Sequence, residues 1–331
     1  MGKYKSDTPD GPVGISRVLS EIELADGKKI VQITPSHRRV LDAARRINQG
    51  DICDQNLGFT TRVLVQANLP HKDPGNDVRV WGRNNGDFSL TLQPGAYITE
   101  LGEHQVIGYP FGVIPRLVMI YLCTYAVQNK TPHIDLGNSM ARFFKEAGIG
   151  EATGGRHGTI TRFKEQVHRL LSCHITFRAE AEIGGQAGVL SKDGGLAARS
   201  MLWWDPKAPH QPTLFDSWIE LRQEFYDEIM AHPVVLNMDA VLALKKSPFA
   251  IDLYTWLNHR VSYMNKPSRI PWVALQKQMG ADYSDVRNFK KAAQGSLRKI
   301  YALWPELKIE EVRGGIKLNP CSPQVPRTKL L

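Results

Sequence analysis

Apolar residues recur at three- and four-residue steps in several long segments, and glycine, proline or a capping side chain marks the ends of most of these segments. The pattern predicts helices over residues 36–49, 113–128, 138–147, 157–172, 239–244, 248–264, 271–279 and 284–303. Extended segments are predicted at residues 29–34, 64–69, 87–99, 174–181, 196–203, 218–221, 307–312 and 316–318. The helix over 113–128 is apolar on nearly all sides, which indicates a central position.

The order helix, strand, helix, helix, hairpin occurs twice, before and after a proline-rich stretch. This order is typical of winged-helix domains, so the predicted fold class is α+β and helix-rich, with tandem winged-helix domains. The predicted units are a flexible tail (1–35), an N-terminal winged-helix domain (36–205), a linker (206–216), a C-terminal winged-helix DNA-binding domain (217–322) and a tail (323–331). The N-terminal domain could contribute both DNA contact and dimerisation. The glycine-rich segment 184–195 is predicted to be a loop between two strands.

The helix predicted from Ser284 to Leu303 has two distinct faces. An apolar stripe follows one side, and basic and amide side chains recur at the same steps on another side. On a major-groove helix, arginine and glutamine can pair with the edges of guanine and adenine, while lysines neutralise phosphates. The alternative is an ordinary solvated helix face. The predicted DNA-binding residues here are Arg287, Lys290, Lys291, Gln294 and Arg298.

The distribution of charge favours the DNA-binding interpretation. The chain carries a net charge of +9, and from residue 285 to the end ten basic residues stand against four acidic ones. A hairpin with Gly314 at its turn follows the helix directly, and we predict that its Arg313 and Lys317 contact phosphate or the minor groove as a wing. An anionic partner is therefore expected, and double-stranded DNA fits this charge.

The helix predicted over 157–172 repeats the arrangement. Its apolar stripe is Ile160, Phe163, Val167 and Leu170. The residues predicted to share the opposite, DNA-facing side, together with one arginine just before the helix, are Arg156, Thr159, Arg162, Gln166 and Arg169. A surface helix with one packed side and no ligand explains the same pattern equally well.

Motifs for catalysis and metal binding do not occur in the sequence. The four cysteines are scattered without a C-x-x-C pair, and the glycines at 150–158 lack the lysine and hydroxyl of a phosphate-binding loop. We therefore predict that the protein is not an enzyme and has no cofactor and no metal site. The most apolar run, 117–127, is shorter than the roughly 20 residues that span a bilayer, and no secretion signal is visible, so no membrane partner and a cytoplasmic location are expected.

Several long strings of the sequence resemble those of the plasmid RepA replication initiators that share a RepA C-terminal domain. The resemblance covers about residues 88–325, and the strings that carry it are GYPFGVIPR (108–116), LGNS (136–139), GGRHG (154–158), EQVHRL (165–170), DLYTWLNHR (252–260), IPWVAL (270–275), QMGADY (278–283) and FKK (289–291). It implies a non-enzymatic initiator that binds repeated sites (iterons) at a plasmid origin and promotes melting of adjacent DNA. It also implies recruitment of the host initiator and replicative helicase, and a homodimeric form.

Three other functions stay open from the sequence. A transcriptional repressor with the same winged-helix fold would bind operators without initiating replication. A nuclease or nicking initiator would need a metal-dependent active site, and an interaction module would direct its basic face at an acidic protein.

Overall fold

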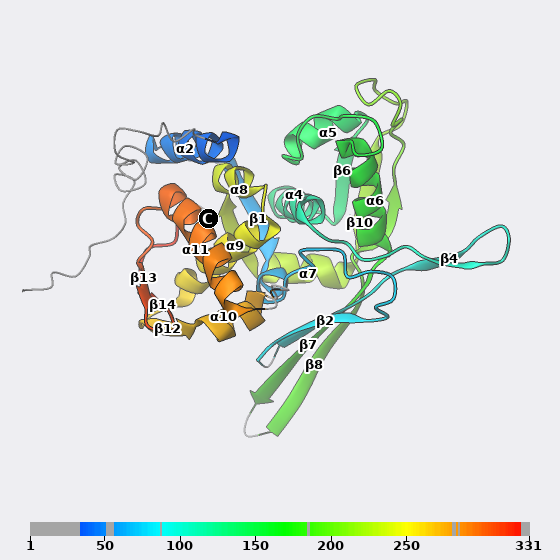
Figure 1. Cartoon of the computed structure of the whole chain (residues 1–331). Helices are drawn as coiled ribbons and strands as arrows, with labels where there is room; N and C mark the ends of the chain where they lie inside the picture. Colours follow the sequence, from blue (N-terminus) through cyan, green and yellow to red (C-terminus); the bar gives the residue numbers. More distant parts are fainter. Residues whose placement is uncertain are drawn as a thin grey trace, which may run out of the picture.

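The computed structural model describes residues 34–50, 56–86, 88–183, 186–279, 283 and 285–325. Most of the predicted tail 1–35, nearly all of the predicted strand at 29–34, Cys53 and Ser284, the predicted first residue of the last helix, lie outside the described residues. The described part is a mixed α+β structure rich in helices (Figure 1), which confirms the predicted fold class at that level. Within it, no helix is long and apolar enough to cross a membrane.

The helices begin where capping residues satisfy their first backbone N–H groups. Thr34 and Ser247 each cap a helix whose first residue is proline, and Asp285 caps the last helix. The helices are α2 (Pro35–Asn48), α3 (Arg62–Gln66), α4 (Val113–Asn129), α5 (Met140–Glu146), α6 (Thr159–Ser172), α7 (Gln223–Ala231), α8 (Met238–Leu244), α9 (Pro248–Tyr263), α10 (Trp272–Met279) and α11 (Val286–Leu303). All eight helices predicted from the sequence are present, with ends shifted by at most two residues.

Within the described residues, the strands form five small antiparallel sheets. They are β1 (Leu57–Thr61), β2 (Trp81–Asn85), β3 (Phe88–Gln93), β4 (Ala96–Ile98), β5 (His104–Val106), β6 (His133–Gly137), β7 (His174–Ile183), β8 (Gln186–Gly195), β9 (Ala197–Met201), β10 (Ser217–Leu221), β11 (Pro233–Asn237), β12 (Ser268–Pro271), β13 (Ile309–Val312) and β14 (Gly315–Leu318). Their orders are β1-β11, β2-β3-β7-β8, β4-β5, β6-β10-β9 and β12-β14-β13.

Two of these sheets share one topology. In β12-β14-β13 the first strand in the chain pairs with the last, and the last pairs with the middle one. The sheet β6-β10-β9 follows the same rule. Each sheet takes its first strand from the segment after a long buried helix, α4 or α9, and two further helices precede its other strands.

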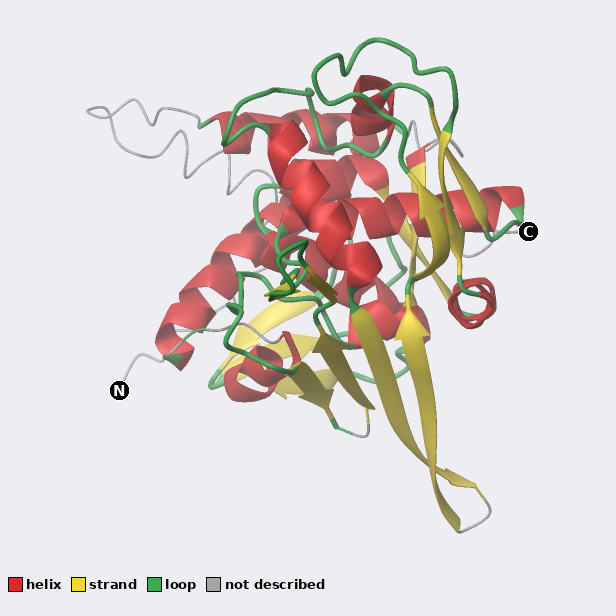
Figure 2. Ribbon diagram, turned by 90° about the vertical axis from the view of Figure 1, so that its right-hand side faces the viewer, coloured by secondary structure: helices red, strands yellow, loops and turns green. Residues whose placement is uncertain are grey.

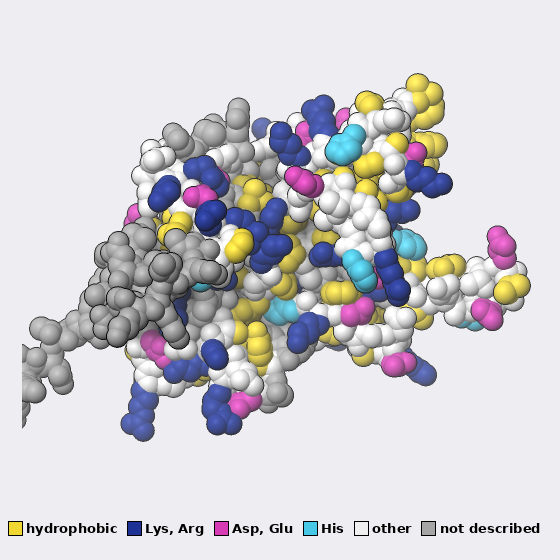
Figure 3. Space-filling model, turned by 45° about the horizontal axis from the view of Figure 1, so that its top comes forward, with side chains coloured by type: hydrophobic (Ala, Val, Ile, Leu, Met, Phe, Trp, Pro, Cys, Tyr) yellow, Lys and Arg dark blue, Asp and Glu magenta, His cyan; other side chains and the backbone are white. Residues whose placement is uncertain are grey.

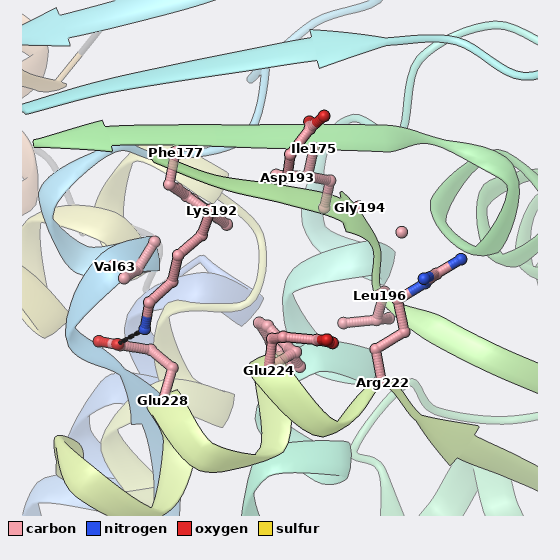
Figure 4. Close-up of a pocket in the computed structure, with 12 residues that line it drawn as sticks. Val63, Ile175, Phe177, Lys192, Asp193, Gly194, Leu196, Arg222, Glu224 and Glu228 are labelled. Atoms are coloured by element: carbon pink, nitrogen blue, oxygen red, sulfur yellow. Dashed lines mark hydrogen bonds and ion pairs between the residues drawn. The ribbon is translucent and has the colours of Figure 1, made fainter. Parts of the chain in front are cut away.

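The glycine-rich segment 184–195 is not the predicted loop. Residues 186–195 form β8, which pairs with β7 from His174↔Gly195 to Ile183↔Gln186. The two strands make a long ribbon that projects from the body of the molecule (Figure 2). At its base, Lys192 of β8 reaches a pocket wall on α7 and forms an ion pair with Glu228 (Nζ–Oε2 2.7 Å; Figure 4).

The predicted strand at 64–69 is also wrong. The segment begins inside α3, a five-residue helix capped by the Thr61 side chain, which accepts a hydrogen bond from the backbone N–H of Val63. Apolar β-branched residues favoured a strand there, but Val63 and Val65 are buried by a helical turn instead. Helix α7 and strand β11, which we did not predict, lie between β10 and α8.

The buried side chains of the described residues form two hydrophobic clusters. One contains residues of α8, α9, α10 and α11 together with Val40, Ala43 and Ala44 of α2. The other contains residues of α4, α5 and α6 together with Ile219 of β10 and Ile229 of α7. Each cluster therefore draws residues from both sides of the predicted linker 206–216, and the domain boundaries stay a prediction.

Candidate nucleic-acid interface

Helix α11 is held against the core by one face. The Asp285 side chain accepts a hydrogen bond from the backbone N–H of Arg287 (2.8 Å) and so caps the helix. Phe289, Ala293 and Ile300 are fully buried, and the Phe289 ring contacts the rings of Phe249, Trp272 and Tyr283. This packing fixes which side of the helix is turned outward.

The opposite face carries the five predicted side chains in one stripe. Arg287, Lys291 and Arg298 are exposed, and Lys290 and Gln294 are half-buried beside them. The Arg287 side chain is 91% exposed and pairs with Asp285 (2.8 Å), which leaves most of its guanidinium open to a ligand. The structure therefore brings these five residues together on an accessible helix surface, and their contact with DNA stays a prediction.

Glu311 on β13 connects the hairpin to this face of α11. Its carboxylate pairs with Lys290 (Oε1–Nζ 2.6 Å) and accepts a hydrogen bond from the Gln294 amide (Oε2–Nε2 2.8 Å). Burial alone would raise the pKa of Glu311, but the hydrogen bonds from Lys290 and Gln294 and the charge of Lys290 outweigh it and lower the pKa. An ionised Glu311 consequently fixes both side chains and offsets part of the positive charge.

The hairpin itself presents its basic residues at and near its tip. Arg313 is exposed in the turn between β13 and β14, where Gly314 has a φ of +83°. Its carbonyl accepts a hydrogen bond from the guanidinium of Arg269 on β12. Lys317 lies on β14 with its ammonium 3.9 Å from Glu310. Arg313 and Lys317 thus lie on the hairpin that follows α11, as the sequence predicts.

The loop before α6 is closed tightly on the start of that helix. The backbone N–H of Thr153 donates to the Thr159 hydroxyl (2.8 Å), and the N–H of Thr159 donates back to the Thr153 hydroxyl (3.0 Å). A Cβ on Gly158 would lie 2.3 Å from two backbone carbonyls of the loop, so glycine is required there. Arg156 and Arg162 are exposed near these two hydrogen bonds, whereas Thr159 is half-buried and holds the loop.

The predicted outward placement of Gln166 and Arg169 is wrong. Gln166 is buried, and its side-chain oxygen accepts a hydrogen bond from the backbone N–H of Phe111 (2.8 Å). The Arg169 side chain is only 12% exposed, pairs with Asp73 (2.8 Å) and Glu165 (2.6 Å), and lies over the Phe111 ring. The segment before α4 covers this side of α6, so both polar groups serve the packing.

We did not single out the basic residues of α2 and of the end of α8. The signal in the sequence was a pair of arginines repeated seven residues apart, Arg38 and Arg39 followed by Arg45 and Arg46. Seven residues are two helical turns, so the pairs share one side of α2. Lys245 and Lys246 follow α8, and the tertiary fold packs α8 on α2 and brings Lys245 within range of the charge of Arg39.

Among the described residues, no cluster of three or more His, Cys, Asp or Glu side chains could hold a metal ion. Cys123 and Cys173 are buried free thiols, and burial raises the pKa of each to about 12. Both are therefore protonated at neutral pH, which is typical of structural cysteines.

Comparison with known proteins connects this architecture to one family. Residues 109–273, about half of the chain and ending before α11, match the model of the family described as plasmid encoded RepA protein. Two crystal structures of domains 2 and 3 of RctB are similar, each at 12% sequence identity. Their TM-scores are 0.49 and 0.47, they cover 77% and 78% of this chain, and the match spans 95% and 96% of their own chains. No curated protein sequence matches the chain.

Proposed function

Because this chain belongs to the family of plasmid encoded RepA proteins, we propose that it is a plasmid replication initiator that binds repeated sites at an origin. The observation that carries the proposal is the surface of α11. One face of the helix is packed on the core, and the accessible face carries four cations and one amide. A basic hairpin follows it directly. Such a surface suits the major groove, where arginine and glutamine distinguish base pairs and lysine neutralises phosphates.

We propose further that the two halves of the chain are tandem winged-helix domains. Support comes from the two three-stranded sheets, β6-β10-β9 and β12-β14-β13, which share one strand order and each follow a long buried helix. In this assignment α6 and α11 are the two recognition helices, and the β7–β8 ribbon is an insertion in the first domain. The second wing is the β13–β14 hairpin.

Individual roles follow from exposure. Arg287, Gln294 and Arg298 would meet base edges, and Lys290, Lys291, Arg313 and Lys317 would meet phosphates. In the first domain, exposed Arg156 and Arg162 are the better placed candidates, and Thr159 would act by holding the loop before α6. Gln166 and Arg169 are assigned no DNA contact, because both are used in packing.

Melting of adjacent DNA, recruitment of the host initiator and helicase, dimerisation and a cytoplasmic location complete the proposal. These properties rest on family membership and on the resemblance of the sequence strings. The protein would act by binding and would need no active site of its own.

The proposal is tested by binding of the purified protein to repeats from its plasmid's origin and to scrambled DNA, across a salt series. We expect a preference of at least about 10³ for the repeats, and affinities that fall steeply with salt because phosphate contacts release counterions. Equal affinity for both DNAs would contradict specific recognition. A plasmid that carries only the candidate origin then separates an initiator, which maintains it when supplied in trans, from a repressor, which does not.

The Glu311→Gln variant is expected to bind both DNAs a few-fold more tightly than the wild-type protein. Loss of the carboxylate removes a negative charge beside the predicted interface and frees Lys290 to neutralise one phosphate, which steepens the salt slope by about one. Glu306→Gln is the matched control, because Glu306 is an exposed acid close by in the chain and forms no ion pair within the described residues. Titration of labelled duplex measures both variants, and weaker binding by Glu311→Gln would contradict the assigned geometry.

A further inference from the structure

Helix α2 has one apolar side and one strongly basic side. Val40, Ala43 and Ala44 are buried where α2 packs on α8 and α11. The remaining surface carries four arginines and one acidic residue, Asp42. The apolar side is already covered by protein, so the helix is not an amphipathic segment awaiting a membrane.

Two further cations, Lys245 and Lys246, follow the end of α8, which packs on α2. Lys245 donates a hydrogen bond to the carbonyl of Gly148 (2.9 Å), which fixes its ammonium over the loop after α5. Burial lowers the pKa of Lys245, and the nearby positive charges of Arg39 and Lys246 lower it further. Within the part of the chain that the structure describes, the Nε atom of Arg39 is buried without a hydrogen-bond partner.

Acidic side chains compensate only part of this charge. Arg46 pairs with Asp239 (2.8 Å), and Arg45 lies 3.9 Å from Asp42. Four cations form no ion pair with an acidic side chain in the described ranges, and we name them the α2–α8 basic cluster: Arg38, Arg39, Lys245 and Lys246. Like charges held together without counter-charges cost free energy, and an anionic ligand would relieve that cost.

The α2–α8 basic cluster lies between the two proposed recognition helices. On one side α2 packs directly on α11. On the other side Lys245 bonds to Gly148, which begins the loop between α5 and α6. Figure 3 shows Lys and Arg side chains gathered over this region between α2 and α5.

We infer that the α2–α8 basic cluster is a third DNA contact, which holds the phosphates of the duplex segment between the stretches read by α6 and by α11. The inference rests on the proposed function and adds a site without base specificity to it. A duplex that reaches both recognition helices has to pass the region between them. Fixed arginines and lysines supply the charge-assisted hydrogen bonds that phosphates accept.

The test is the double variant Arg38→Gln/Lys246→Gln, because both side chains are exposed and their loss leaves the core intact. Each phosphate contact contributes about 0.9 to the slope of log affinity against log salt, so the slope is expected to fall by about 1.8 on origin repeats. The preference for repeats over scrambled DNA should stay unchanged. Lys207→Gln/Lys266→Gln is the matched control, since it also removes two exposed positive charges but from loops outside α2 and α8. Arg38→Lys should retain the wild-type slope.

Hydroxyl-radical footprinting gives an independent readout. The wild-type protein should protect backbone between the two base-specific stretches, and the double variant should lose that protection alone. Unchanged slope and footprint in a protein that still prefers its repeats would overturn the third contact and leave the proposed function standing. If the wild-type protein shows no preference for its repeats, the proposed function fails first. A slope that falls equally in the lysine control would reduce the effect to net charge and also overturn the inference.

Discussion

The Asp252→Ala variant is expected to lose about 3–5 kcal/mol of its free energy of unfolding, because the substitution leaves a buried guanidinium without its counter-charge. Asp252 on α9 and Arg116 on α4 have side chains only 7% and 6% exposed. Two hydrogen bonds of 2.7 Å join them, from Nε to Oδ1 and from Nη2 to Oδ2. His71 reaches the same carboxylate at 2.7 Å.

The surroundings of this pair explain why removal of one partner is costly. Arg116 also donates to three backbone carbonyls, those of Leu69, Pro70 and Gly112. Burial alone would raise the pKa of Asp252, but the charge of Arg116 and the hydrogen bonds from His71 and Arg116 outweigh it and lower the pKa. The ion pair is therefore intact at neutral pH. Its contribution to stability is present above the ordinary aspartate pKa of 3.8 and is lost as the pH falls through the lower folded value.

Urea denaturation of the wild-type and Asp252→Ala proteins measures the loss of free energy of unfolding. Glu220→Ala is the control, because Glu220 pairs with Arg199 at 2.6 Å on the surface and should cost less than about 1 kcal/mol. An Asp252→Ala protein no less stable than this control would show that the buried pair does not support the fold. Since the pair joins α4 to α9, we also expect both hydrophobic clusters to loosen together.

The sequence predicted the helices well because their signals are local. Helix α11 has an apolar stripe ending at Trp304 that is visible in a single window of residues, and its cap Asp285 is one residue after the start predicted at Ser284. The basic face of α11 follows from the same periodicity. Five predicted DNA-binding residues therefore share one accessible surface in the structure.

The sequence-based predictions that failed depend on tertiary contacts between segments far apart in the chain. Periodicity placed Gln166 and Arg169 on one side of α6 but could not show that the segment around Phe111 covers that side. The glycines of 184–195 indicated a loop, yet β7 supplies a partner for ten residues of pairing, and pairing overrides local preference. The Arg116–Asp252 pair lies 136 residues apart in the chain, within two strings that the sequence marked separately.

The same limit applies to Glu311. In the sequence, Glu311 is one of four acidic residues among ten basic ones. In the fold, its carboxylate pairs with Lys290 and accepts a hydrogen bond from Gln294. The Gln294 amide is therefore oriented before any DNA arrives, which reduces the entropy that base recognition would cost. Orientation by a neighbouring acid distinguishes Gln294 from Lys291, which has no such partner within the described residues.

This difference leads to the second large effect that we expect. Gln294→Ala should weaken binding to origin repeats by about 1–3 kcal/mol, because a glutamine that pairs with one base discriminates by that amount. Binding to scrambled DNA should change little, since an amide neutralises no phosphate. Lys291→Ala is the matched comparison: it should weaken both complexes and lower the salt slope by about one. Fluorescence anisotropy on both duplexes at several salt concentrations measures all four affinities.

The affinities of these variants distinguish three possible roles of α11 in DNA binding. In the first, Gln294→Ala loses affinity for the repeats alone. If a change of one base pair in the repeat then makes the wild-type and Gln294→Ala proteins bind equally well, Gln294 reads that base pair. If both variants lose equally on both duplexes, α11 contributes charge and no sequence recognition, and specificity has to come from exposed Arg156, just before α6, and Arg162, on α6. If neither variant changes binding, α11 does not lie in the groove at all. That result would remove the observation on which the proposed function depends, because the packed core leaves α11 no other accessible face to present.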